Sequence, residues 1–534
     1  PGGASVIIPG GQTYVVNTLV LGTGADLDIG SSGSLTVNGN VYAGQTITGS
    51  GSLIVAGGAS QLSGTFPTLT ITGSATAVGP TTITGDLIID GTGDGAEFNV
   101  GGAKVDVAGT LFTQTGGLLT MDGNTDTLLV GSASFAGGNE FGHLTDGVLV
   151  VRGSNFDQGF GDNASFMATA NHTTVFNNTG GSTAINITHP ANSQFASVEV
   201  LSPNGVDFNE SGLGRVRMVG NLTLGSNAVV TGDTLEVFGT FTAGAVSDLT
   251  LNVLTLVNTP VLSGTYNVTT TQFSGPAISI PAAPILYERL LVDGTATLAS
   301  DVTARTVLIT GSGLVDVNGY NFLADSLYTT ASGALVMDAA EDTVLVADTA
   351  AFFGGDESTL LTDGVLRLGG SFNATGDHFT STGNHLTEFF TAIPKVMKIS
   401  PDGYCEGSCP YSQRVQFAHL KIDATNVSID DPVEAGLFAG DLAMTGANVT
   451  GPYVDLQVAG DIHADATSAL TLRKLMIAGT VDVQIPDGSF SVATVQFQGN
   501  GQLLPDLNYN QLLITGALVT LADTIDAASV IVAN

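Results

Sequence analysis

The sequence predicts an all-β fold, namely an elongated parallel β-solenoid (β-helix) built from an internally duplicated module of about 220 residues. Three observations support this prediction. Short runs in which apolar and small polar residues alternate, each ended by Gly, Asn or Asp, recur along the chain and are typical of strands joined by tight turns. Helix formers in amphipathic register are almost absent. One long tract occurs twice, which indicates a repeated structural module.

The duplicated tract covers residues 119–149 and returns at 335–366, a displacement of 216 to 217 positions. The residues of the first copy that recur are Met121-Asp122, Asp126-Thr127, Phe135, Gly137-Gly138 and Leu144-Thr145-Asp146-Gly147-Val148-Leu149. Their counterparts in the second copy are Met337-Asp338, Asp342-Thr343, Phe352, Gly354-Gly355 and Leu361-Thr362-Asp363-Gly364-Val365-Leu366.

Other repeated phrases set the predicted module boundaries. The first part of the chain is a series of strand-like pieces punctuated by glycine, such as SLTVNGNVYAG, and we assign residues 1–66 to an N-terminal partial module. The phrase that begins at Pro67 is echoed from Pro284 and from Pro505. We therefore predict a first full module at 67–283, a second full module at 284–504 and a C-terminal partial module at 505–534.

Each full module also contains a Phe- and Asn-rich run, at 156–178 and 372–390. We interpret these runs as looser segments whose aromatic side chains fill the interior. A coil of about 20 residues predicts on the order of 25 coils for the whole chain. The competing architecture is a string of β-sandwich domains. The absence of Trp, the matched LxVxG phrases and the lack of a Pro-rich linker favour the solenoid.

The charge balance argues against two classes of partner. The formal net charge is −35, from 48 acidic and 13 basic residues, and the basic residues are scattered. A phosphate-binding surface needs clustered Lys and Arg, so we expect neither nucleic acid nor an anionic membrane surface as a partner. Strong negative charge keeps a protein soluble and attracts divalent cations.

Two cysteines, Cys405 and Cys409, lie in a Gly- and Pro-containing stretch near 401–412 that we predict to be a flank loop of the second module. We expect them to form a disulfide, with a metal site as the weaker alternative because nothing nearby completes a ligand set. A disulfide implies an extracellular or cell-surface protein. No apolar run is long enough to insert into a membrane, and a chain that starts at Pro1 suggests a processed N-terminus and secretion.

Repeated acidic residues are the candidate metal ligands. The candidates for Ca²⁺, the only cofactor that the sequence suggests, are Asp122, Asp126, Asp338, Asp342, Asp90 and Asp94. The alternative is that these carboxylates cap turns by binding nearby main-chain groups. The spacing does not match an EF-hand loop.

His172 and His385 recur with their modules, and we interpret them as turn or interior residues rather than metal ligands. Several Asn-x-Ser/Thr triplets permit a surface-glycan hypothesis. The candidate acceptors are Asn163, Asn171, Asn221, Asn267, Asn373 and Asn448.

Catalysis has little support in the sequence. Right-handed β-helices often carry polysaccharide lyases and hydrolases, whose sites need paired acids or a basic residue beside Ca²⁺-binding carboxylates. The scarcity of Lys and Arg, the absence of Trp and the lack of a dense acid–base cluster argue against such a site. We predict no catalytic residues and keep a polysaccharide-degrading enzyme as a distant alternative.

The phrases LxVxGxLxTxxGxLxMD, GGxxxxLTDGVLxxxGxF and NHxTxxF resemble the repetitive β-solenoid surface proteins of bacteria, including autotransporter passengers and filamentous-haemagglutinin-like adhesins. The resemblance implies a passive extracellular scaffold for adhesion, a surface layer or a fibre. Unlike autotransporters, this sequence shows no terminal membrane barrel.

The ends of the sequence suggest how such a scaffold assembles. The expected assembly residues are Val6, Ile7, Ile8, Val530, Ile531 and Val532. Uncovered strand edges recruit other strands, so we expect head-to-tail stacking of copies into a filament. The alternative is an adhesin whose flank loops bind a glycan, a cell-surface polymer or a host protein.

Overall fold

The fold is described from a computed structural model. It describes residues 3–92, 95–159, 165–210, 215–281, 285–400, 415–423, 425–430, 436–516, 518–521 and 525–533. Strands make up 61% of the chain and stack in parallel as a β-solenoid of about 23 coils with about 21 residues each, and the described residues contain no α-helix. The predicted fold class and coil length are therefore confirmed.

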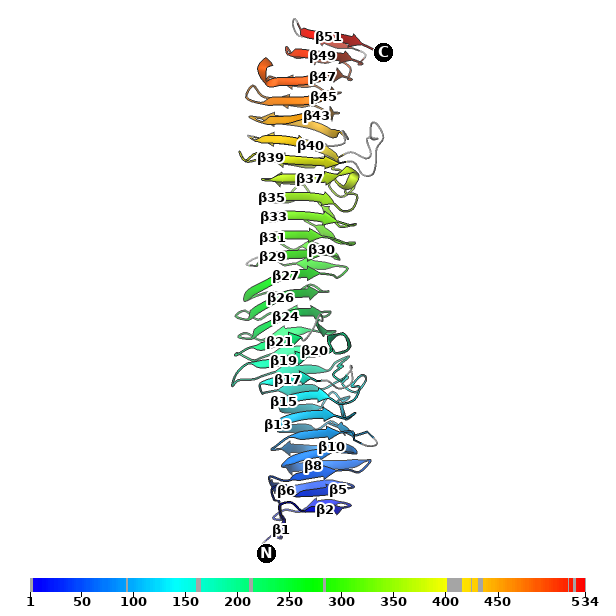
Figure 1. The fold of residues 1–534 in the computed structure, drawn as a ribbon, viewed down its shortest axis with the longest axis vertical. Helices are drawn as coiled ribbons and strands as arrows, with labels where there is room; N and C mark the ends of the chain where they lie inside the picture. The colour runs from blue at the N-terminus through cyan, green and yellow to red at the C-terminus, as the bar shows by residue number, and fades with distance from the viewer. Residues whose placement is uncertain are drawn as a thin grey trace. The chain divides into compact units, whose positions relative to one another are not determined.

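The chain divides into two compact units, Pro1–Thr269 and Thr270–Asn534. Each unit contains one copy of the duplicated tract. The predicted module limits at 66/67, 283/284 and 504/505 remain a prediction from sequence. In each unit, strands one coil apart in the chain lie side by side, as β13, β15 and β17 do in the first unit and β31, β33 and β35 in the second (Figure 1).

The strands of the first unit are short, and one 3₁₀ turn, η1 (Pro190–Asn192), lies among them. The strands are β1 (Ser5–Ile8), β2 (Thr13–Val16), β3 (Leu19–Leu21), β4 (Asp26–Ile29), β5 (Ser34–Val37), β6 (Val41–Gly49), β7 (Ser52–Val55), β8 (Ser60–Phe66), β9 (Thr68–Ile71), β10 (Ser74–Ile83), β11 (Leu87–Asp90), β12 (Glu97–Asn99), β13 (Lys104–Gln114), β14 (Leu118–Thr120), β15 (Thr127–Ala136), β16 (Val148–Val151), β17 (Asn155–Gln158), β18 (Thr173–Phe176), β19 (Thr183–Ile187), β20 (Ser197–Val200), β21 (Val206–Glu210), β22 (Val216–Met218), β23 (Leu222–Leu224), β24 (Val229–Val237), β25 (Phe241–Thr242) and β26 (Asp248–Leu256).

The second unit follows the strand β27 (Thr265–Phe273) and has the 3₁₀ turns η2 (Gly376–His378) and η4 (Asp487–Ser489). Its strands are β28 (Ile278–Ile280), β29 (Leu286–Val292), β30 (Thr295–Leu298), β31 (Val302–Ile309), β32 (Leu314–Asp316), β33 (Asn321–Thr330), β34 (Ala334–Val336), β35 (Thr343–Phe353), β36 (Val365–Leu368), β37 (Ser371–Thr375), β38 (Leu386–Phe389), β39 (Lys395–Ser400), β40 (Val415–Asp423), β41 (Asn426–Asp430), β42 (Leu437–Thr445), β43 (Asn448–Val458), β44 (Ile462–Ala464), β45 (Ala469–Ile477), β46 (Val481–Val483), β47 (Phe490–Phe497), β48 (Gln502–Leu504), β49 (Asn508–Ile514), β50 (Val519–Leu521) and β51 (Asp526–Val532).

The alternating sequence pattern explains how a coil buries its interior. Successive side chains of a strand point to opposite faces, so every second residue points inward. In β13, Val105 and Leu111 are buried and lie in register with Leu128 and Ala133 of β15. Burying a Val or Leu side chain contributes about 1.5–3 kcal/mol, and each coil repeats this contribution against the coils before and after it.

Aromatic side chains fill the interior where the Phe-rich runs interrupt the regular coils. In the first unit, Phe156 contacts Phe166 and Phe195 with ring centroids 4.9 and 5.4 Å apart. In the second unit, Phe372 lies 5.0 Å from Phe379. These rings are fully or almost fully buried, as expected from the sequence. Such pairs add about 0.5–1.5 kcal/mol each beyond the burial of their surface.

The duplicated tract folds in the same way in both units. Met121 N donates a hydrogen bond to His143 O at 2.8 Å, and Met337 N donates to Leu360 O at 2.8 Å. The turn glycines Gly147 and Gly364 have φ angles of 76° and 74°. The two copies of the duplicated tract therefore adopt the same local structure.

Candidate functional site

Two aspartates at corresponding positions of the two units, Asp126 and Asp342, are buried inside the coils. Asp126 is 1% exposed and accepts hydrogen bonds from Gly102 N at 2.5 Å and Gly123 N at 3.0 Å. Asp342 is fully buried and accepts from the main chain of Gly319 at 2.5 Å and of Ala339 at 3.0 Å. Each carboxylate therefore uses both of its oxygens to fix a turn, which is the capping role considered as the alternative to Ca²⁺ binding.

The remaining Ca²⁺ candidates do not gather around these two carboxylates. Asp122 and Asp338 are exposed, and Asp94 lies outside the described residues. Asp90 accepts hydrogen bonds from the hydroxyl and main chain of Thr92 and from Gln114, and the Thr92 hydroxyl contributes most to lowering the pKa of its carboxyl. Over the described ranges, no group of three or more His, Cys, Asp or Glu side chains is arranged to hold a metal ion. Calcium binding stays a prediction from sequence.

A buried glutamate in each unit was missed by the sequence interpretation. Glu140 accepts hydrogen bonds from Leu119 N at 3.0 and 3.2 Å, and Glu357 accepts from Leu335 N at 3.2 Å. Neither side chain is exposed. Burial raises the pKa of both carboxyls well above the usual value, which favours the neutral acid. Both follow a repeated Gly-Gly pair at corresponding positions, and that repetition was the signal available in the sequence.

The recurrent histidines are interior residues, in agreement with the interpretation from sequence. His172 Nδ1 lies 3.0 Å from Asp146 O, and His385 Nδ1 lies 2.8 Å from Asp363 O. Both rings are fully buried, and within the described part of the chain neither Nε2 atom has a hydrogen-bond partner. Burial lowers the pKa of His172 and lowers that of His385 to about 4. The contact to a carbonyl oxygen places a proton on Nδ1. The lowered pKa values leave Nε2 without a proton at neutral pH, so the rings are neutral supports of the turn.

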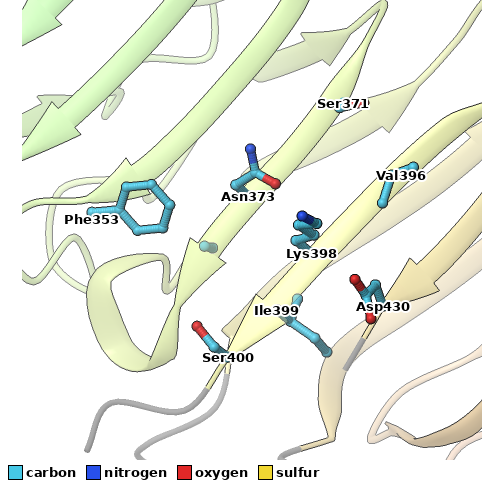
Figure 2. Close-up of a pocket in the computed structure, with 9 residues that line it drawn as sticks. Phe353, Ser371, Asn373, Val396, Lys398, Ile399, Ser400 and Asp430 are labelled. Atoms are coloured by element: carbon cyan, nitrogen blue, oxygen red, sulfur yellow. The ribbon is translucent and has the colours of Figure 1, made fainter. Parts of the chain in front are cut away.

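A surface groove in the second unit is the clearest candidate for a binding site. It has a volume of about 690 Å³ and lies over β35, β37, β39 and β41, with Phe353 at one side and Asp430 at the other (Figure 2). Phe353 is 43% exposed and Val396 39% exposed, so the groove has an apolar aromatic wall and an aliphatic part. Its volume falls within the range of about 300–1,000 Å³ typical of ligand sites.

Strand register aligns the polar groups of this groove. Asn373 of β37 lies opposite Lys398 of β39, which lies opposite Asp430 of β41. All three side chains belong to outward-facing positions, because the residues between them in each strand are buried. The column therefore places an amide, an ammonium and a carboxylate on three successive coils, about 4.8 Å apart.

Another outward column in the same unit differs because its charges bind one another. Arg367, Glu388 and Lys421 lie in register, with Glu388 2.7 Å from both cations. Among the described residues, by contrast, no hydrogen bond or ion pair joins the side chains of Asn373, Lys398 or Asp430 to any partner. The groove residues therefore have unused donors and acceptors that face solvent.

The predicted assembly residues lie in the outermost described coils. Val6 is 54% exposed and Ile7 66% exposed, whereas Ile8 is buried within the coil. Val6 and Ile7 line an apolar groove of about 570 Å³ together with Tyr14 and Val20. In β51, Val530, Ile531 and Val532 are exposed and pair on one side with β49.

The remaining predicted sites are the two cysteines and the glycosylation candidates. Cys405, Cys409 and Asn163 lie outside the described residues. The glycosylation candidates that are exposed on the surface are Asn171, Asn221, Asn267 and Asn448. Asn373 is half-buried in the groove, and glycosylation of all these residues stays a prediction.

Comparison with known proteins gives no assignment. The chain matches no family model, no curated protein and no solved structure. Among the residues that the structure describes, no helix has the length and apolar character needed to cross a membrane. Two surfaces are the candidates for function, namely the solvent-facing groove and the apolar edges of the outermost described coils.

Proposed function

We propose that this chain is a non-enzymatic structural protein of the extracellular space or cell surface, which assembles end to end with further copies of itself. The observation that carries the proposal is the exposure of apolar strand edges in the outermost coils. The buried Asp, Glu and His residues that recur in both units also support the proposal. Their side chains bind main-chain groups and so maintain the coils.

The terminal edges have the chemistry of strands that pair with another chain. Val6 and Tyr14 are exposed at 54% and 48%, although they lie in register with the buried residues Leu27 and Leu35. In β51, the exposed residues Val530 and Val532 occupy the last coil. Open edges of this kind recruit strands, and parallel stacking of unlike ends gives a heterologous contact that extends into a filament.

The proposed joint would repeat the coil-on-coil contact found inside each unit. β1 pairs with β4 in parallel, and β49 pairs with β51 in parallel, each with residues matched one to one. A β51 edge placed on the β1 coil of another copy would continue this stacking and bury the inward-facing side chains of Val6 and Val530. The bacterial surface proteins that the sequence resembles are consistent with this role.

Self-association can be tested with the full chain. We expect light scattering to show mass that increases with protein concentration, and electron microscopy to show filaments. Val6→Lys or Val530→Lys should prevent this growth, because a charge would be buried in the joint. Val6 lies in register with the buried Leu27, and Val530 lies in register with the buried Leu512. Val246→Lys is the matched control, since Val246 is 68% exposed but lies away from the edges. Single chains at high concentration, or filaments that both edge variants still form, would refute the proposal.

A second candidate function is adhesion through a flank surface. The groove over β37, β39 and β41 favours it, because Asn373, Lys398 and Asp430 face solvent in register.

A further inference from the structure

We infer that the groove over β35, β37, β39 and β41 binds a neutral, extended oligosaccharide, with one sugar ring on Phe353 and the hydroxyl groups of the neighbouring sugars on Asn373, Lys398 and Asp430. This inference goes beyond end-to-end assembly, which uses the terminal coils. It assigns a ligand class to a surface formed by strands of the second unit only.

The aromatic wall is the first part of the argument. Phe353 ends strand β35 with its ring 43% exposed, whereas the preceding Phe352 is fully buried in the interior. Leaving a large apolar ring in water has no benefit for the coil itself. The apolar face of a sugar ring covers such a ring well, because its C–H groups contact the negative face of the π-system.

The polar column is the second part. Asn373 supplies two N–H donors and a carbonyl acceptor, Lys398 supplies three donors, and Asp430 supplies acceptors only. Sugar hydroxyls both donate and accept, so this mixture fits them better than it fits a ligand with one sign of charge. Figure 2 shows these three side chains on adjacent strands, with Phe353 beside Asn373.

The spacing of the column is the third part. Asn373, Lys398 and Asp430 follow one another by one coil each, which is about 4.8 Å and close to the length of one pyranose unit. The same column continues on the other side of Asn373 through Ala351 to Tyr328, a second aromatic residue that is partly exposed. A chain of several sugars can therefore lie across Asn373, Lys398 and Asp430 with one polar contact at each coil.

Charge decides between neutral and acidic sugars. The chain has a formal charge of −35, which repels anionic polymers at long range. Within the groove, Lys398 and Asp430 bring opposite charges, so no excess of positive charge attracts carboxylated or sulfated sugars. A neutral glycan is not repelled by the net negative charge of the chain and needs no excess of positive charge in the groove.

The first unit provides a natural comparison. Ala136 occupies the position that corresponds to Phe353, and Asp157 and Asn186 correspond to the polar column. Asn186 Nδ2 donates to Asp157 Oδ1 at 2.6 Å, so these groups are already used by each other. At the described positions, the aromatic wall and the unpaired polar groups therefore occur in the second copy of the module and not in the first.

The test uses the full chain from a host without N-glycosylation, so that Asn373 is unmodified. The probes are laminarin, yeast α-mannan, hydroxyethylcellulose and, as the acidic polymer, polygalacturonate. Affinity electrophoresis should show retardation by at least one of the three neutral polymers and none by polygalacturonate. Retardation by no polymer, or by polygalacturonate alone, overturns the inference.

Variants then locate the binding surface. Phe353→Ala should weaken binding of the retarding polymer about tenfold, the loss expected for one stacked ring. Lys398→Met and Asn373→Ala provide a second test through residues outside the aromatic wall. Tyr453→Ala is the matched control, since Tyr453 is an aromatic residue of the same unit that is 70% exposed away from the groove.

The controls separate this inference from the assembly proposal. All variants should keep the circular dichroism spectrum and melting temperature of the parent, because each substitutes an outward-facing side chain. Val6→Lys should bind the polymer as the parent does, and Phe353→Ala should still self-associate. Groove variants that bind as tightly as Tyr453→Ala would overturn the inference whatever the assembly experiment shows.

Discussion

Lowering the pH should loosen the second unit around His385. This ring is fully buried, and burial lowers its pKa from 6.5 to about 4. The unfolded chain therefore binds a proton at higher pH than the folded chain, so the stability that neutral His385 contributes is complete above pH 6.5 and is lost as the pH falls towards 4. At 1.36 kcal/mol per pKa unit, the loss amounts to about 3 kcal/mol.

The perturbation that isolates this effect is His385→Asn. The Asn amide can keep the hydrogen bond to Asp363 O but does not titrate, so the variant should lose less stability than the parent between pH 6.5 and pH 4. His463→Asn is the control, because His463 lies on the surface beside Asp482, with 51% of its side chain exposed.

Local measurements suit this protein better than a single melting curve, because coils of a repeat protein can open separately. Hydrogen exchange of peptides that cover 361–390 should become faster at acidic pH in the parent and much less so in His385→Asn. NMR titration of the histidine rings measures the pKa directly. A His385 ring that titrates near 6.5, or equal acid sensitivity in both proteins, would refute the reasoning.

Three further changes test the interior. Glu357→Gln should stabilise the second unit at pH 8 and make no difference near pH 4. Burial raises the pKa of Glu357, so the stability of the parent falls as the pH rises through that pKa. Denaturation at the two pH values measures this difference, and a variant that is less stable than the parent at pH 8 would contradict it. Phe372→Ala should lower the free energy of unfolding by about 3–5 kcal/mol, because Phe372 packs against Phe379. The loss should appear as faster hydrogen exchange in β37, and exchange rates equal to those of the parent would show that the ring stack contributes little. Gly364→Ala should lower the free energy of unfolding by about 1–3 kcal/mol, because the φ angle of Gly364 is 74° and a Cβ atom there would lie 2.7 Å from Asp342 Cβ. Gly488→Ala is the control and should have little effect, because a Cβ atom at Gly488 would meet no atom within 4 Å. Equal denaturation midpoints for the two variants would be evidence against strain at Gly364.

The fold was predictable because its determinants are local. Alternation of residues such as Val105 and Val107 within one strand shows which side chains point inward, and the next coil repeats the pattern. The matching of Asp126 with Asp342 likewise indicated that two stretches share one structure. No knowledge of distant contacts was needed for either step.

The candidate sites were less predictable because they depend on how coils align. Glu140 and Glu357 look like solvated turn residues in the sequence, and only the main-chain N–H groups of Leu119 and Leu335 in the preceding coil explain why they are buried. Asn373, Lys398 and Asp430 are separated by unequal lengths of chain, so their register is hidden until the loops between the strands are placed.

The aromatic stacks have a consequence for how the protein folds. Each Phe cluster gathers rings from several consecutive coils, so its formation fixes the stacking of those coils at once. Regular coils can then be added one at a time to either side, each gaining contacts with the coil already formed. We therefore expect two nuclei, one around Phe156 and one around Phe372, from which ordered structure propagates outward within each unit.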